Sequence, residues 1–299
     1  MDTRRSRVTG VALMLGSALS TQTGAAVGAL AFPVIGPVGV VAIRQWVAGA
    51  ILLLMGRPRL RGFSRTQWVP VTGLAAVFAV MNLAVYVAID RIGLGLTVTL
   101  EFLGPLTIAL AGALVATPVG ARRRVTIACV LFATAGVLIL TRPQATADCR
   151  GVGIGLLAAA CWASYILLNR AVGQRFTGVE GSAAAGLLSA LVYVPIGIVA
   201  LIIHPLTPTA LALAAGAGVL ASAVPFAADV CALRRVPAHF FGIFMSVNPV
   251  FAAAIGSVVL GEKLGLLDWT AIGVIVTANV GAVLTTQLQS SAVSAVNAA

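Results

Sequence analysis

Long apolar runs, rarely interrupted by charge, constrain the fold of this chain more than any other feature of its sequence. A helix of about 20 apolar residues crosses the hydrocarbon core of a bilayer. A membrane β-barrel would instead show alternation over about ten residues. Hydrophobic residues make up 60% of the chain and charged residues only 9%, against about 25% charged in a soluble domain. The sequence therefore predicts an all-α membrane protein with ten transmembrane helices.

The ten expected helices form two halves of five, joined by a linker at residues 142–150. The expected spans are Val8–Phe32, Val38–Gly56, Gln67–Ile89, Gly95–Ala116 and Val125–Thr141, then Gly151–Val172, Gly181–His204, Thr209–Leu233, His239–Leu260 and Leu266–Leu288. Proline and glycine at residues 33–39 predict a tight turn between the first two spans. The polar tail, residues 289–299, is expected to be disordered.

Lysine and arginine are distributed unevenly among the segments that connect these spans. If the N-terminus is cytoplasmic, 14 of the 19 lie on the cytoplasmic side and 4 on the opposite side, and Arg44 lies within a span. Cytoplasmic loops of membrane proteins carry such an excess. We therefore expect both termini in the cytoplasm, and the net charge of +11 reflects topology rather than nucleic-acid binding.

The two halves are similar in sequence at an offset of 144 residues. The matched positions are Arg91 and Arg235, Pro105 and Pro249, Ala109 and Ala253, and Gly112 and Gly256. Because each half has five spans, the second enters the membrane upside down relative to the first. We expect residues 1–141 and 151–288 to be inverted repeats, an arrangement found in secondary transporters with substrate sites at the repeat interface.

Glu101 is the leading candidate for function because it lies inside the expected span Gly95–Ala116. A charge at that depth costs about 2.5–3.5 kcal/mol on insertion scales and usually faces a bundle interior or a wet cavity. Pro105 cannot donate a backbone hydrogen bond to the Glu101 carbonyl, so a kink is expected there. The second half has Met245 at the equivalent position. A structural ion pair without a transport role is the alternative.

Arg44 is the expected partner of Glu101, since both lie about six residues, or roughly 9 Å, into their spans from the same side. Together they could hold an amino acid, with the arginine on its carboxylate and the glutamate on its ammonium group. A fixed structural pair is the competing interpretation. If transport is coupled to protons, Glu101 is the best carrier.

Other polar residues within the spans are softer candidates for substrate binding or coupling. They are Asn82, Tyr86, Trp162, Tyr165, Asn169, Asn248 and Asp229. Each could equally be a hydrogen-bonding contact between helices, and Asp229 could be solvated near the cytoplasmic interface. Glu262 is expected to mark the end of a helix rather than to touch substrate.

Several functional classes find no support in the sequence. It has no phosphate-binding loop, metalloprotease motif, nucleophile elbow or dinucleotide fingerprint, so we expect no enzyme activity and no cofactor. The four cysteines have no spacing that fits a metal site or a disulfide framework.

Six motifs together resemble the drug/metabolite transporter superfamily, specifically EamA-domain transporters. The motifs are GPVGVVAIR (Gly36–Arg44), MNLAVYVAI (Met81–Ile89), TLEFLGPL (Thr99–Leu106), CWASYIL (Cys161–Leu167), FGIFMSVNPVFAA (Phe241–Ala253) and VLGEKL (Val259–Leu264). They are most similar to inner-membrane threonine/homoserine exporters. The resemblance implies export of small neutral amino acids, driven by membrane potential or a proton gradient. It also implies that Arg44, Asn82, Tyr86, Glu101, Trp162 and Tyr165 match the subgroup's pattern.

Two other interpretations remain open from the sequence. One is an EamA-type exporter of another metabolite or a drug, which an aromatic cavity without paired charges would favour. The other is a membrane assembly or sensor protein that transports nothing, although the short basic loops offer little interaction surface. In each case the expected surroundings are membrane lipid, without nucleic acid.

Overall fold

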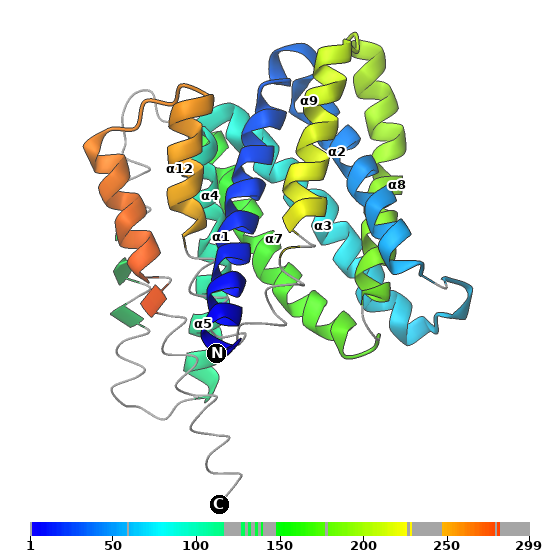
Figure 1. The fold of residues 1–299 in the computed structure, drawn as a ribbon, viewed down its shortest axis with the longest axis horizontal. Helices are drawn as coiled ribbons and strands as arrows, with labels where there is room; N and C mark the ends of the chain where they lie inside the picture. Colours follow the sequence, from blue (N-terminus) through cyan, green and yellow to red (C-terminus); the bar gives the residue numbers. More distant parts are fainter. Residues whose placement is uncertain are drawn as a thin grey trace, which may run out of the picture.

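The computed structural model describes residues 2–58, 60–116, 148–176, 179–225 and 247–278, together with 127–128, 131–132, 135–136, 139, 228 and 280–281. Across this part of the chain the secondary structure is helical and contains no strand (Figure 1). The expected all-α class is therefore confirmed. The fifth expected span lies mostly outside these residues, as do Asp229, Met245 and the tail 289–299.

The first half of the chain contributes α1 to α5, and the second contributes α7 onwards. The bounds are α1 Asp2–Ala29, α2 Phe32–Gly56, α3 Arg65–Ile92, α4 Leu94–Glu101, α5 Leu103–Ala116, α7 Cys149–Gly173, α8 Glu180–Ile203, α9 Pro208–Gly218 and α12 Asn248–Val259. A 3₁₀ turn covers Leu60–Gly62, a π-helical turn covers Val219–Ala223, and a further apolar helix covers Leu266–Ala278.

Four of the described helices are long and apolar enough to cross a membrane. They are α2, α3, α7 and α8, with lengths of 25, 28, 25 and 24 residues. Shorter apolar helices cover Leu94–Ile108, Pro208–Ala223, Asn248–Val259 and Leu266–Ala278. This pattern agrees with a multi-pass membrane protein.

The helices form a bundle with two distinct ends (Figure 1). We call the end that holds the α1–α2 and α8–α9 connections the upper end, as it is drawn in Figure 1. The lower end holds the N-terminus of α1 and the connection at residues 57–64. The most extensive packing is antiparallel, between α2 and α8 and between α3 and α7. Elements from the two halves of the chain are therefore interleaved.

The tight turn expected at residues 33–39 is wrong, because α2 already begins at Phe32. Pro33 lies in the first turn of α2, where a missing N–H costs nothing. Pro37 disfavours helical geometry at the residue before it, and Gly36 takes φ 66° and ψ 165° within α2. The sequence signal therefore produces a break inside α2, and the chain reverses earlier, at residues 30–31.

The kink expected near Pro105 is confirmed as a break between α4 and α5. Helix α4 ends at Glu101 and α5 begins at Leu103, with Phe102 between them. Pro105 lacks the N–H that would bond the Glu101 carbonyl. The break therefore places Glu101 at a helix end inside the bundle.

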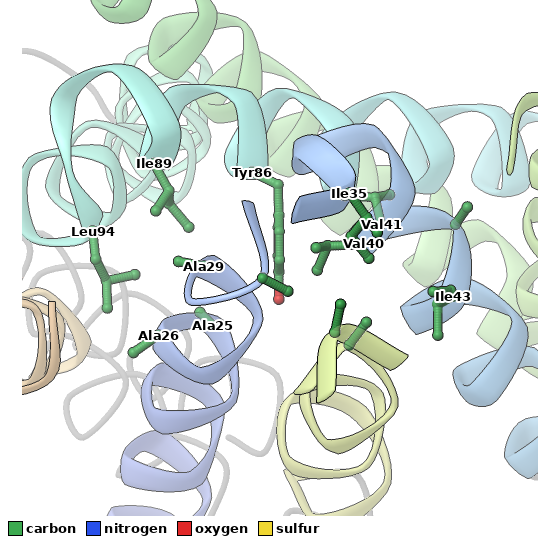
Figure 2. Packing of buried hydrophobic residues seen from close by; sticks show 14 of the residues in the cluster. Ala25, Ala26, Ala29, Ile35, Val40, Val41, Ile43, Tyr86, Ile89 and Leu94 are labelled. Carbon is green, nitrogen blue, oxygen red and sulfur yellow. The ribbon is translucent and has the colours of Figure 1, made fainter. Parts of the chain in front are cut away.

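An apolar cluster fills the upper end of the bundle. Its buried members include residues at the end of α1, the start of α2 and the α3–α4 turn, among them Ala29, Ile35, Ile89 and Leu94. In Figure 2, Tyr86 points from α3 into this cluster, between α1 and α2. Small residues let these helices approach closely, as membrane helices commonly do.

Candidate functional site

A cavity of about 410 Å³ lies among the helices, below the apolar cluster of the upper end. Its walls come from α1, α2, α3, α4, α7 and α8, from the π-helical turn and from the first residue of α12. Both halves of the chain therefore line the cavity. Its volume is within the range of small-molecule sites in proteins.

The cavity brings together seven of the eight site residues expected from the sequence. These are Arg44, Asn82, Tyr86, Glu101, Trp162, Tyr165 and Asn248. The eighth, Asp229, lies outside the described residues. Helical spacing on single elements predicted some of these neighbours, whereas their convergence from five helices depends on the tertiary fold.

Arg44 is held by two residues of α3. Its Nη1 donates a short hydrogen bond to Oδ1 of Asn82, and its guanidinium carbon lies 5.0 Å from the centre of the Tyr86 ring. Asn82 in turn donates from Nδ2 to the Phe78 carbonyl at 2.7 Å. This network fixes the guanidinium by one hydrogen bond and a cation–π contact.

Glu101 is 9% exposed and lines the same cavity. The expected pairing with Arg44 is not formed: within the described residues no ion pair or hydrogen bond joins Glu101 to another side chain. Arg44 bonds to Asn82 instead, because both are on the facing walls of α2 and α3. A guanidinium and a carboxyl group thus share one cavity without bonding to each other.

Two buried polar atoms beside the cavity have no hydrogen-bond partner. They are Nε of Arg44 and Oη of Tyr86, whose side chain is 1% exposed. A buried polar group without a partner costs about 1–3 kcal/mol. Their position in a cavity wall means that a bound molecule could supply the missing partners.

Aromatic side chains form another part of the cavity wall. Trp162 meets Phe102 edge to face, with ring centres 4.6 Å apart, and Tyr165 lies 6.1 Å from Phe78. Gly104 makes this wall possible, because a Cβ there would lie 2.4 Å from the Ala159 carbonyl oxygen of α7.

Gln22 is a polar wall residue that the sequence analysis missed. Its Nε2 donates to Oδ1 of Asn248 at 2.9 Å, and both residues are buried. The signal that could have found it is an amide within an apolar span, since such groups must find partners in a membrane. The bond ties α1 to the first residue of α12.

A polar chain continues from the aromatic wall toward the lower end. Asn169 donates from Nδ2 to the Tyr165 hydroxyl at 3.5 Å, and Ser182 donates to Oδ1 of Asn169 at 3.3 Å. Asn169 and Ser182 lie in the last turns of α7 and the first turn of α8. All three line the cavity, so its polar lining reaches the α7–α8 connection.

Glu262 is absent from the cavity wall, as the sequence analysis expected, but it does more than end a helix. Its carboxylate accepts hydrogen bonds from the backbone N–H groups of Leu94 and Gly95, the first residues of α4. A carboxylate suits a helix N-terminus because unpaired N–H groups point at it. Glu262 thus joins the segment after α12 to the helix that carries Glu101.

The arrangement is suited to binding a small molecule. No group of three or more potential metal ligands occurs in the described part of the chain. The cavity presents a cation, a carboxyl group and an orphan hydroxyl at separate points of its wall. Such a lining can orient a small molecule that carries both charges.

Comparisons with known proteins agree with a transporter. Residues 150–284 match the EamA-like transporter family. The threonine/homoserine exporter RhtA of Escherichia coli (strain K12) is 33% identical over 287 residues, which cover 94% of this chain and 93% of that protein. The threonine/homoserine exporter RhtA of Salmonella typhimurium (strain LT2) is 34% identical over 273 residues, covering 89% and 88%.

One solved structure also shares the fold. A crystal structure described only as that of a protein superposes with a TM-score of 0.58 at 17% identity, over 94% of this chain and 98% of that one. The extent and identity of the sequence matches settle the relationship: this chain belongs to the EamA-like transporter family.

Proposed function

We propose that this protein is a secondary transporter that exports small neutral amino acids, such as threonine and homoserine, across a bacterial inner membrane by alternating access. One observation carries the proposal: Arg44 and Glu101 line the same buried cavity but do not pair with each other. Each is therefore available to a substrate that carries both charges.

The two charged groups match the two ends of an amino acid. The Arg44 guanidinium, with Nε still unpartnered, receives the substrate carboxylate, since arginine binds carboxylates with paired N–H donors. Glu101 receives the ammonium group. The orphan hydroxyl of Tyr86 is a partner for the carboxylate or for a side-chain hydroxyl of the substrate.

Helix packing supports the proposed inverted repeats, residues 1–141 and 151–288 joined by the linker 142–150. Exchanging the halves turns the contact between α3 and α7 into the one between α9 and α1. It likewise turns α3–α8 into α9–α2, and α5–α7 into α12–α1, and each of these pairs packs together. Such exchange is the expected mark of a pseudo-two-fold axis.

Individual residues also obey the 144-residue offset. Gln45 donates a hydrogen bond of 2.6 Å to Ser189, its counterpart at this offset. This contact supports a pseudo-two-fold axis between α2 and α8, because equivalent residues of two repeats meet only beside such an axis. The repeats can then rock about the cavity they share.

The cavity wall is symmetric in position but not in chemistry. At the same offset, Ala18, Thr21 and Ala25 of α1 correspond to Trp162, Tyr165 and Asn169 of α7, and all six line the cavity. One wall is small and the other bulky and polar. This asymmetry leaves room for substrate against α1 while the aromatic wall of α7 limits its side chain.

The distribution of basic residues supports an orientation with both termini cytoplasmic. In that orientation the lower end, with the N-terminus and residues 57–64, faces the cytoplasm. If protons drive export, Glu101 is the group in the described cavity wall that can take up and release them.

A second candidate is export of another metabolite or a drug by the same mechanism. The aromatic side chains of Phe78, Phe102, Trp162 and Tyr165 favour it, because aromatic walls bind apolar and cationic molecules. A drug site, however, gains nothing from a buried arginine held beside an unpaired carboxyl group. The charges therefore favour an amino acid.

Export from cells and from vesicles tests the proposal. We expect wild-type protein to raise resistance to toxic threonine analogues, and expect Glu101→Gln and Arg44→Ala to abolish it. Arg175→Ala is the matched control, since the exposed Arg175 side chain donates to the Ala171 carbonyl of its own helix and does not line the cavity. Wild-type resistance in both cavity variants would contradict the assignment of Arg44 and Glu101 to the substrate site.

Reconstituted vesicles separate the two candidate functions. The flux of a labelled amino acid is measured with and without a proton gradient. We expect unlabelled threonine and homoserine to reduce this flux by competition, and lipophilic cations to leave it unchanged. Competition by the cations alone would favour the drug exporter. If the flux does not depend on the proton gradient, export is not coupled to protons.

A further inference from the structure

Three side chains and two backbone amides fasten the two halves of the chain together at the upper end. We call them the upper clasp: Arg91, Asp148 and Glu262, with the N–H groups of Leu94 and Gly95. We propose that the upper clasp is a gate latch that holds the upper end closed, so that the resting transporter faces the lower end. The inference rests on the alternating-access function proposed above.

The first arm of the clasp is Glu262. Both of its carboxylate oxygens are used, one by the Leu94 N–H and one by the Gly95 N–H, the latter at 3.3 Å. The surrounding backbone is shaped for it: a Cβ on Gly93 would lie 2.9 Å from the carboxylate, and one on Gly256 would lie 2.4 Å from it. Gly93 also has φ +85°, which favours glycine.

The second arm is the ion pair between Arg91 and Asp148. Nη1 of Arg91, in the last turn of α3, lies 2.6 Å from Oδ2 of Asp148. The other oxygen of Asp148 accepts from the N–H groups of Arg150 and Gly151 and caps α7. A Cβ on Gly151 would lie 2.6 Å from Ile92, so the helix ends approach closely.

Both arms of the clasp contact the same short segment of the first half, the α3–α4 turn. Arg91 lies two residues before the turn at Gly93, and Leu94 and Gly95 follow it. Asp148 lies in the linker and caps α7, the first helix of the second half, and Glu262 follows α12 in that half. Opening the upper end in a rocking motion separates the α3–α4 turn from these two carboxylates, so the clasp must break.

The cavity fits a state that is closed above. Ala29, Ile35 and Ile89 of the apolar cluster lie nearer the upper end than the cavity-lining residues of their own helices. Toward the lower end, the cavity wall reaches Leu52, near the end of α2, and Ser182, near the start of α8. The polar lining thus extends away from the clasp.

The repeat does not reproduce the clasp at the lower end. At the 144-residue offset, Arg91 corresponds to Arg235, Asp148 to Arg4 and Glu262 to Pro118. Neither carboxylate has an acidic counterpart, and a second arginine replaces the acid of the ion pair. The residues at the equivalent positions therefore do not repeat the clasp in sequence.

Accessibility of a cysteine in the cavity tests the latch without any substrate. The four native cysteines are changed to alanine, and Thr21→Cys, in the cavity wall, supplies one thiol. A membrane-impermeant maleimide is applied to right-side-out and inverted vesicles. We expect labelling to be faster from the face of the lower end.

Loss of the clasp should redirect access. Glu262→Gln keeps the shape of the side chain but removes its charge, and Asp148→Asn does the same in the other arm. Each is expected to raise labelling from the upper face by about tenfold, the effect of losing one charge-assisted hydrogen bond, and to slow labelling from the lower face.

Asp268→Asn is the matched control, because Asp268 accepts only from Gly265 in its own segment. We expect it to leave both rates unchanged. If Glu262→Gln fails to fold, Asp148→Asn repeats the measurement on a separate helix, and intact folding is read from gel filtration in detergent. Unchanged labelling in folded variants of both arms would overturn the latch.

The outcome separates the latch from the proposed transport function. Protein that labels as expected but exports no amino acid contradicts the transport function and supports the latch. Protein that exports normally but shows no change in labelling contradicts the latch alone.

Discussion

The guanidinium of Arg44 donates its hydrogen bond to the side chain of Asn82 and not to Glu101. Because Asn82 is neutral, it orients the arginine without cancelling its charge. The Phe78 carbonyl accepts from Nδ2 of Asn82, which fixes the amide so that its oxygen faces Arg44. The arginine is thereby held in place for a negatively charged partner.

This relationship predicts losses of different size for two small substitutions at residue 82. Asn82→Asp places a carboxylate against Arg44, which competes with the substrate carboxylate, so we expect export to fall by at least about tenfold. Asn82→Ala removes the orienting bond but leaves Arg44 charged, so a smaller loss is expected, mainly as a raised half-saturating concentration. Vesicle flux at several substrate concentrations measures both.

The outcome that contradicts this prediction is equal activity of the two variants. Asn169→Asp serves as a control, because Asn169 also lines the cavity but bonds to Tyr165 and Ser182 rather than to Arg44. Its effect on the carboxylate site should be smaller than that of Asn82→Asp.

Gly104 predicts a loss of stability that a second glycine does not share. A Cβ at residue 104 would lie 2.4 Å from the Ala159 carbonyl oxygen, which is rigid backbone, so Gly104→Ala must push α5 away from α7. We expect a cost of about 1–3 kcal/mol and a lower melting temperature in detergent. Displacement of Trp162, 3.1 Å from that Cβ, should also weaken export.

Gly153→Ala is the control, since a Cβ there would meet nothing within 4 Å. Alanine is the better helix former by about 1 kcal/mol, so this variant should melt at the same temperature or higher. If Gly104→Ala were as stable as Gly153→Ala, the close approach of α5 to α7 would be wrong.

Asp148 predicts an acid-sensitive component of stability at the upper end. Hydrogen bonds from the Gly151 N–H and the Arg91 side chain lower the pKa of this carboxyl group below its ordinary value. A group whose pKa is lower in the folded state contributes stability above its unfolded pKa, about 3.9. That contribution is lost as the pH falls through the folded value.

We therefore expect melting temperatures of the wild type to be level from neutral pH to about pH 5 and to fall in more acidic buffer. Asp148→Asn should melt lower at neutral pH and show a weaker fall in acid, because the asparagine does not titrate. Arg91→Gln should lie between the two, since the backbone hydrogen bonds of Asp148 remain. Identical acid profiles of wild type and Asp148→Asn would contradict the assignment.

Much of the site could be predicted from the sequence because the cost of polar groups in a membrane is local. Glu101 and Arg44 are conspicuous in apolar spans, and Pro105 announces the break after Glu101, since a proline removes the same hydrogen bond in any helix. The turn expected at residues 33–39 failed because proline at a helix start and within a helix gives similar sequence signals.

The sequence by itself determined that this chain is an all-α EamA-like protein with few charged and polar residues inside its apolar spans. Hydropathy and the positions of prolines can be read from single segments. In a membrane these local properties determine which segments form helices and where the helices break. Only the tertiary structure decided that Arg44 bonds to Asn82 rather than to Glu101, that Gln22 reaches Asn248, and that Glu262 caps α4. These partners lie 38, 226 and 168 residues apart in the chain. Spacing in the sequence therefore does not identify them, and the packing of the helices decides which polar groups meet.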